Sequence, residues 1–202
     1  MTTLFHTSAT HILRFDTIRD RLAPDIQLNH VVRTDWLDRA RGGIDKRLRT
    51  EILDAVGTAR GPVLCSCSTI GGIAAEAGAI RIDQPMMQAA ADIGGRILVA
   101  YCLMSTATPT LELLYKCLDG RAADIHSLPL PHLWALFESG DTEAFEQSIA
   151  AEVDVWAAKN GTPDVVVLAQ ASMSGAQEFA TVDCPILTSP ETAFRALLAE
   201  LR

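Results

Sequence analysis

The chain has 202 residues, 49% of them hydrophobic, which is ample for the core of one large α/β domain or two small ones. Its formal net charge of -8, with no basic stripe, argues against nucleic acid or an anionic lipid surface as a partner. No run of 18 apolar residues and no leader-like N-terminus is present, so we expect a cytoplasmic protein with no membrane partner.

Cysteine usage points to the same compartment. The chain has an odd number of cysteines and is long enough to fold without disulfides, which suits reduced thiols. The "CSC" pair supplies two sulfurs, and no second pair with ligand spacing follows, so we expect no metal site. The five cysteines are Cys65, Cys67, Cys102, Cys117 and Cys184.

Short apolar runs alternate with helical patterns along the chain. Most runs carry Val, Ile or Leu at consecutive positions, as in strands buried on both faces of a parallel sheet. The fold class expected from this alternation is doubly wound α/β. The runs cover residues 4–7, 28–32, 62–66, 96–103, 123–130, 164–170 and 184–189.

Three helices have clear signals. Residues 44–59 and 141–159 each carry apolar residues at near four-residue spacing, and the second starts at a cap of Asp141 or Thr142 and runs out at 160–161. The last helix is expected to have Ser189 as its cap, followed by Pro190 at the first helical position. The apolar positions are Ile44, Leu48, Ile52 and Val56 in the first helix and Phe145, Ile149, Val153 and Trp156 in the second.

Two turns about a hundred residues apart look alike. "PVLCSCSTIGG" (62–72) and "VVVLAQASMSGA" (165–176) are apolar strands that end in small, polar residues and glycine. In open α/β sheets, ligands bind beyond the carboxyl ends of strands, where helix N-termini offer N–H groups to anions. The echo suggests equivalent turns in two related halves, although any doubly wound protein has apolar strands that end in small residues.

Cys67 is the most reactive candidate in the first turn. It stands after the apolar run and before an expected helix start, where the helix dipole favours a thiolate. The alternative is that it is a small buried residue of the core. Cys65 would share a strand face with it, as a core neighbour, a redox partner or a metal ligand.

Five segments, in order along the chain, carry a resemblance to a known family. They are "LFHTSATHILRFD", "CSCSTIGG", "RIDQPMMQAA" with "RILVAYCLMSTATPTLELL", "DVVVLAQASM" and "CPILTSPETAF". Together they resemble the aspartate/glutamate racemase superfamily, which includes hydantoin racemases, maleate isomerases and arylmalonate decarboxylases. The resemblance implies two similar α/β domains with the active site between them. Residues 1–95 plus 189–202 would form the first domain, and residues 96–188 the second.

The resemblance also implies a mechanism that needs no cofactor. In such racemases two cysteines flank the substrate α-carbon, and one removes a proton while the other delivers one to the opposite face. The first of these cysteines maps onto Cys67. The second maps onto Gln170, or onto Ala171 if the alignment is moved one step, and neither side chain exchanges a proton at neutral pH. Cys102 and Cys184 are weaker substitutes by position.

Hydroxyl-bearing residues follow several expected strands. They would hydrogen-bond a carboxylate or enolate of the substrate, although each could equally be a helix cap. These candidate substrate-binding residues are Thr7, Ser68, Thr69, Ser105, Thr106 and Ser172.

Three functions remain open. The leading one is a cofactor-independent isomerase or racemase-like enzyme acting on a small carboxylate or amino acid, with Cys67 as thiolate base and Gln170 polarising the substrate. The second is a one-thiol decarboxylase or lyase. The third is a catalytically silent carboxylate-binding protein on a racemase scaffold. The resemblance also allows a homodimer.

Overall fold

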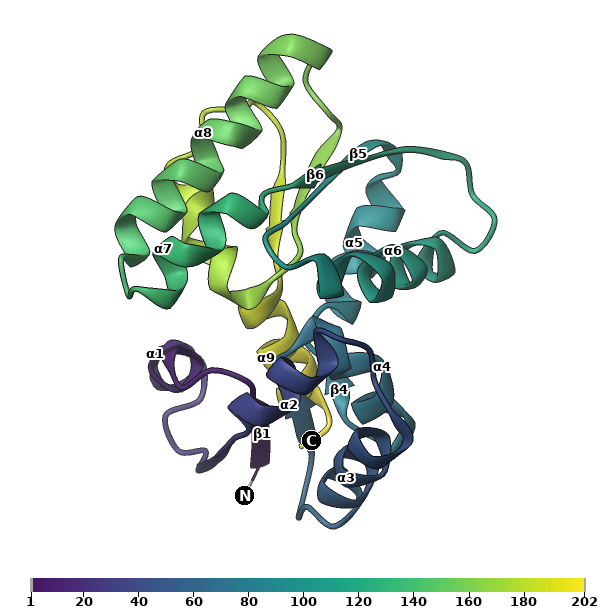
Figure 1. Ribbon diagram of the computed structural model, residues 1–202, viewed down its shortest axis with the longest axis vertical. Helices are drawn as coiled ribbons and strands as arrows, with labels where there is room; N and C mark the ends of the chain where they lie inside the picture. The colour runs from purple at the N-terminus through teal and green to yellow at the C-terminus, as the bar shows by residue number, and fades with distance from the viewer. Residues whose placement is uncertain (1, 202) are drawn as a thin grey trace. The chain divides into compact units, whose positions relative to one another are not determined.

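The computed structural model describes residues 2–201 and has two four-stranded parallel sheets, each in a compact unit of its own (Figure 1). The first unit runs to Pro85 and takes up the chain again from Pro190, and the second covers Met86–Ser189. This is the α/β fold class expected from the sequence.

The chain crosses into the second unit earlier than the sequence predicts. The expected division lay after residue 95, whereas the two units separate after Pro85. The residues between belong to helix α5 (Gln84–Ile93), whose buried Met86 and Met87 join the core of the second sheet. An amphipathic helix belongs to the unit whose sheet buries its apolar face, so α5 is part of the second unit.

The first unit has the strand order β2-β1-β3-β4. Phe5 stacks on Trp36 of α2 on one face of the sheet. The neighbouring side chain of the same strand, His6, packs near Phe15 of α1, which contacts Phe194 of α9. The strands are β1 (Thr2–His6), β2 (Leu28–Val32), β3 (Val63–Cys65) and β4 (Ile80–Arg81), and the helices are α1 (Thr10–Leu22), α2 (Thr34–Ala40), α3 (Lys46–Gly57), α4 (Ser68–Glu76) and α9 (Ser189–Ala199).

The second unit repeats this order as β6-β5-β7-β8. β3 and β7 therefore hold equivalent places in the two sheets, as the sequence echo suggests. The strands are β5 (Gly95–Tyr101), β6 (Ala123–Pro129), β7 (Val165–Leu168) and β8 (Ile186–Thr188). Besides α5, the helices are α6 (Met104–Leu118), the 3-10 helix η1 (Pro131–Leu133), α7 (Trp134–Glu138), α8 (Thr142–Asn160) and the 3-10 helix η2 (Ala171–Glu178).

Both faces of the second sheet are covered, which explains its consecutive apolar residues. Alternate residues of a strand point to opposite faces. In β5, Ile97 and Val99 pack in the core formed with α5 and α6, whereas Leu98 and Ala100 pack with α8 and η2. α7 and α8 lie side by side on the latter face (Figure 1).

The observed helix starts agree with the capping residues expected from the sequence, except at α3 and α9. Asp141 caps α8 through the Ala144 N–H. α3 begins at Lys46 because the Asp45 carboxylate accepts a hydrogen bond from the Leu48 N–H, and so Ile44 lies outside the helix. α9 begins at Ser189 itself, one residue earlier than expected.

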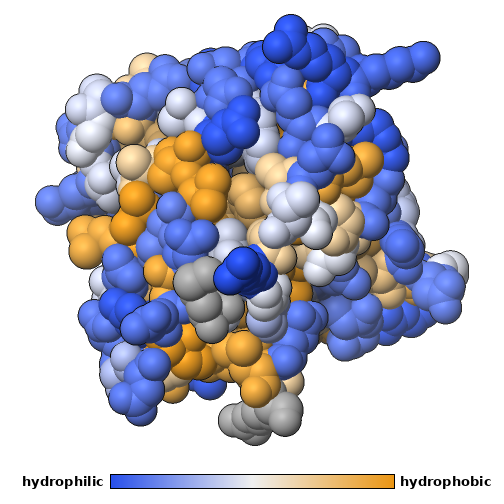
Figure 2. Space-filling view, turned by 90° about the horizontal axis from the view of Figure 1, so that it is seen from below, coloured by the Kyte–Doolittle hydropathy of each residue, from blue (hydrophilic) through white to orange (hydrophobic). Residues whose placement is uncertain are grey.

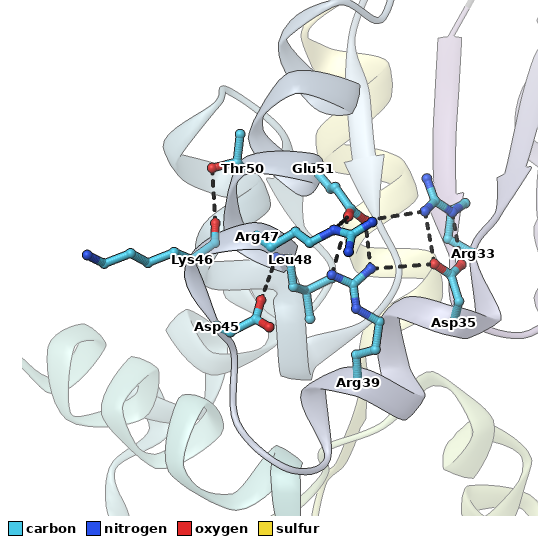
Figure 3. Close-up of polar contacts among 9 residues, drawn as sticks. All are labelled: Arg33, Asp35, Arg39, Asp45, Lys46, Arg47, Leu48, Thr50 and Glu51. Atoms are coloured by element: carbon cyan, nitrogen blue, oxygen red, sulfur yellow. Dashed lines mark hydrogen bonds and ion pairs between the residues drawn. The ribbon is translucent and has the colours of Figure 1, made fainter.

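An ion-pair network joins α2 to α3 beyond the end of β2 (Figure 3). Arg39 and Arg47 both bind Glu51 of α3, at 2.7 and 3.2 Å. Arg33, which directly follows β2, binds Asp35 at 2.9 Å and lies over the ring of Trp36. Because each guanidinium faces a carboxylate, the network holds the two helices together.

The surface mixes polar and apolar residues. On the face drawn in Figure 2, apolar residues reach the surface in separate groups between hydrophilic ones. Among residues 2–201, no helix is both long and apolar enough to cross a membrane.

Candidate functional site

Cys67 lies at the carboxyl edge of the first sheet, between β3 and α4. It is the N-cap residue of α4 in an extended conformation, and its thiol makes no capping hydrogen bond. The turn is held from both sides: the Ser66 N–H donates to the Phe5 carbonyl at 2.9 Å, and the Cys65 thiol approaches the Cys67 carbonyl at 3.8 Å. Cys67 is 8% exposed.

Three of the expected hydroxyl residues lie at this same edge. Thr7 follows β1, which pairs with β3, and Ser68 and Thr69 open α4. All three are buried. The structure therefore brings Cys67 and its three expected neighbours in the first unit to adjacent strand ends.

The start of α4 packs closely on a buried ion pair. Arg81 binds the fully buried Asp83 at 2.8 Å. A Cβ added to Gly71 or Gly72 would lie 3.5 Å from the Arg81 guanidinium, at ordinary van der Waals distance, so the first turns of the helix lie against this side chain. Asp83 thus has a structural role, as the buried partner of Arg81.

Gln170 occupies the equivalent turn of the second unit, after β7, where a thiol was expected. Its side-chain oxygen accepts hydrogen bonds from the Cys102 and Leu103 N–H groups, at 2.6 and 2.9 Å. These groups lie just before α6, where an anion would otherwise be attracted. With the oxygen so occupied, Gln170 has its amide NH₂ left to offer a ligand. Ala171 is the next residue and is buried.

The remaining hydroxyl candidates lie at the same edge of the second sheet. Ser105 and Thr106 stand in the first turn of α6, and Ser172 stands in η2. Thr106 and Ser172 are buried. The Ser172 Oγ has no hydrogen-bond partner among the described residues, so this hydroxyl is available to a ligand that reaches it.

Three of the other thiols keep their protons at neutral pH, so they supply no thiolate that could act as a base. Burial raises the pKa of Cys102 to about 12, and its side chain packs in the core with α8. Burial raises the pKa of Cys65, and burial also raises that of Cys184. Cys184 precedes β8 and so lies at the amino end of the second sheet, opposite the Gln170 turn. Cys102 and Cys184 therefore do not replace the missing thiol.

Sequence reasoning missed a polar chain directly behind the Cys67 turn. His6 Nδ1 lies 2.7 Å from Ser66 Oγ, and His6 Nε2 lies 2.8 Å from His30 Nδ1. The available signal was that these residues fall on three adjacent strands or strand ends of a parallel sheet. Among residues 2–201, no group of three or more His, Cys, Asp or Glu side chains is placed to hold a metal ion.

Solved structures share this architecture at low sequence identity. Glutamate racemase from Francisella tularensis, solved with D-glutamate, matches 99% of this chain and 80% of its own at 13% identity and a TM-score of 0.74. An aspartate racemase homologue from Pyrococcus horikoshii matches 98% and 97% at 10% identity, with a TM-score of 0.64. Allantoin racemase from Pseudomonas fluorescens matches 100% and 90% at 13% identity, with a TM-score of 0.58.

No family profile matches the sequence, and no curated protein matches it either. The structural matches nevertheless agree with one another and span nearly the whole chain. This protein therefore shares the α/β fold of these glutamate racemase, aspartate racemase homologue and allantoin racemase structures.

Proposed function

We propose that this protein is a cofactor-independent isomerase of racemase type that acts on a small carboxylate or amino acid, with Cys67 as the thiolate base. The observation that carries the proposal is the place of Cys67 at the N-cap of α4, at the carboxyl edge of a parallel sheet. Ligands of open α/β sheets bind at this edge, and a helix N-terminus stabilises an anion there.

The chemistry proposed is abstraction of an α-proton next to a carboxylate. The thiolate takes the proton, and negative charge moves onto the carboxylate oxygens. Hydrogen-bond donors at the strand ends stabilise that charge because they are oriented before the reaction. Thr7, Ser68 and Thr69 are the proposed donors beside Cys67, and the second unit has candidate donors of its own in Ser105, Thr106 and Ser172.

Gln170 is proposed to contribute its amide NH₂ as a further donor. Its oxygen already accepts from two backbone N–H groups, and this fixes the orientation of the amide. Gln170 has no side-chain proton that it could exchange at neutral pH, so Cys67 would act as the single thiol. The neighbours of this fold act on glutamate and allantoin by their names, which supports a small carboxylate or ureide as the substrate class.

The test is α-proton exchange in deuterated water with a panel of aspartate, glutamate, hydantoins and malonates. The expected result is exchange by the wild type with at least one compound, and a fall of about 100-fold or more in Cys67→Ala, since a positioned proton carrier contributes about that much. Cys102→Ala is the matched control, because it removes a thiol that packs in the core.

The other outcomes identify the competing functions. Full activity in Cys67→Ala would contradict the proposal. Loss of carbon dioxide from a malonate would assign the protein to one-thiol decarboxylation. Thermal stabilisation by a carboxylate with no exchange, inversion or decarboxylation would make it a binding protein.

A further inference from the structure

β6 is a long edge strand of the second sheet. It has seven residues, Ala123–Pro129, and pairs with β5 along its whole length. In the described part of the chain no strand pairs with its other side, because β6 stands first in the order β6-β5-β7-β8. An unpaired edge presents a row of N–H and C=O groups to which another strand can bond.

The hydrogen bonds to β5 show which backbone groups of β6 face outward. The Leu130 N–H donates to the carbonyl of Tyr101, which is level with Pro129. In a parallel ladder alternate residues bond to the same neighbouring strand, so the even-numbered residues of β6 face β5. The odd-numbered ones face outward, and Pro129 among them has no N–H. The outward N–H groups are those of Ala123, Ile125 and Ser127.

This outward edge is unbonded and open to solvent. Among residues 2–201, no hydrogen bond joins another group to the outward N–H or C=O groups of β6. Ser127 is exposed, and the side chains of Asp124 and His126 are 60% and 38% exposed. The edge is therefore accessible to a partner strand.

The strand is held in place from both faces. Ala123 and Ile125 pack against the core formed with α5 and α6. On the other face Leu128 packs against the core formed with α8, and the His126 ring lies 5.2 Å from that of Trp156. The outward groups are thus oriented before a partner binds.

We propose that β6 pairs with β6 of a second copy of this chain, antiparallel, about a two-fold axis at Ile125. In this register Ile125 pairs with its own counterpart, and Ala123 pairs with Ser127 of the second copy. Each strand donates its three outward N–H groups, so six hydrogen bonds form and no outward donor is left over. Pro129 lies beyond the paired stretch, where its missing N–H is not needed.

The side chains favour this register over its neighbours. Asp124 comes opposite His126 of the second copy, twice by symmetry, and such cross-strand pairs of carboxylate and imidazole are favourable. With the axis at Asp124, two carboxylates would face each other. With the axis at His126, two imidazoles would do so, and Pro129 would come opposite Ala123 without an N–H to donate. This self-complementarity identifies the occupant of the edge as a second copy.

The dimer would have one continuous sheet. Joining the two four-stranded sheets through β6 gives eight strands about the two-fold axis. The interface is independent of the chemistry proposed for Cys67, because it uses only the outward edge of the second sheet.

Sedimentation of the full chain tests the association. We expect the wild type to form a dimer. Ser127→Pro removes an outward N–H from each strand and leaves the bonds to β5 intact, so two of the six hydrogen bonds are lost. The dissociation constant should rise by about tenfold or more. Ser127→Ala keeps the N–H and should dimerise like the wild type. A wild type that stays monomeric at its highest soluble concentration, or equal association of the two variants, would overturn the proposal.

Cross-linking under mild oxidation tests the register. Asp124 and His126 of the two copies form a non-hydrogen-bonded pair, whose Cα atoms lie about 4.5 Å apart, within reach of a disulfide. We expect a covalent dimer when Asp124→Cys and His126→Cys chains are mixed, and none from either variant alone. The wild type controls for the native thiols, of which Cys117 and Cys184 are half-buried.

Two results of the cross-linking would contradict the proposed pairing. A mixture that gives no covalent dimer would show that these positions do not meet. A covalent dimer from His126→Cys alone would place the axis at His126 and overturn the register.

Discussion

His6 and His11 are two buried imidazoles that make the stability of the first unit depend on pH. Burial, with His11 and His30 beside it, lowers the pKa of His6 to about 3, and burial with Arg14 nearby lowers that of His11 to about 3. The free imidazole titrates near pH 6.5. Below that pH the unfolded chain binds protons that the folded chain does not.

Stability is therefore fully present above about pH 6.5 and falls as the pH decreases toward 3, by about 1.4 kcal/mol per pH unit for each histidine. Urea unfolding at several pH values checks this. His11→Phe should make the slope shallower, and His132→Gln, which changes an exposed histidine, should leave it unchanged. A wild-type stability that is flat between pH 7 and 5 would contradict the assignment.

Gln170 has a structural role that can be tested separately from its proposed contact with substrate. Gln170→Ala leaves the Cys102 and Leu103 N–H groups without their acceptor, and a buried unsatisfied donor costs about 1–3 kcal/mol. Urea unfolding should show this loss. Gln170→Glu keeps an acceptor oxygen and removes the NH₂, so it should remain stable and bind carboxylates more weakly. Stronger carboxylate binding by Gln170→Glu would refute the donor role.

For single residues, the sequence predicts which residue types lie at the strand ends but not which hydrogen bonds their side chains form. The position of Cys67 at a helix start could be predicted from the apolar run and the residues after it. The bonds of Gln170 to the α6 start and the contact of Ser66 with His6 could not, because they join residues 68 and 60 positions apart. The alternation of side chains along a strand predicts on which face of the sheet a residue lies. It does not predict which ring nitrogen of a histidine forms a hydrogen bond, because that depends on how the side chains pack.

Among the elements, β5 begins at a glycine that no other residue replaces without cost. Gly95 has a φ of +66°, and a Cβ there would lie 2.2 Å from the Asp164 carboxylate, which binds the Arg96 N–H. Gly95→Ala should therefore lower the free energy of unfolding by about 2 kcal/mol, from the left-handed backbone and the displaced hydrogen bond.

Gly120→Ala is the matched control for this change. Gly120 also has a positive φ, of +79°, and its Cβ would meet nothing within 4 Å. It should show the backbone cost alone, about 1 kcal/mol. Denaturation curves that rank Gly120→Ala as the more harmful change would contradict the steric argument.

Elements with a long apolar pattern could be predicted, and short ones could not. The consecutive Val165, Val166 and Val167 identify β7 because both faces of the sheet are covered. β4 has two residues, Ile80–Arg81, too few to show any periodicity. The spacing of Ile44 predicts that it belongs to α3, but the Asp45 cap starts the helix after it.

For the whole molecule, the repeated strand order gives two equivalent turns with different chemistry. The turn after β3 carries a thiol, and the turn after β7 carries an amide whose oxygen binds the two N–H groups just before α6. The sequence echo could predict the repeat, since both strands end in small residues. It could not place the division at Pro85, because the packing of α5 decides that.

We propose that one thiol, Cys67, exchanges the substrate α-proton without a partner thiol on the opposite face of the substrate. The most direct measurement is the position of deuterium when a single enantiomer is incubated with the protein in deuterated water. A one-thiol site predicts deuterium in the recovered, uninverted enantiomer at a rate above that of inversion. Deuterium confined to the inverted product would show two opposed proton carriers and contradict the proposed single-thiol site.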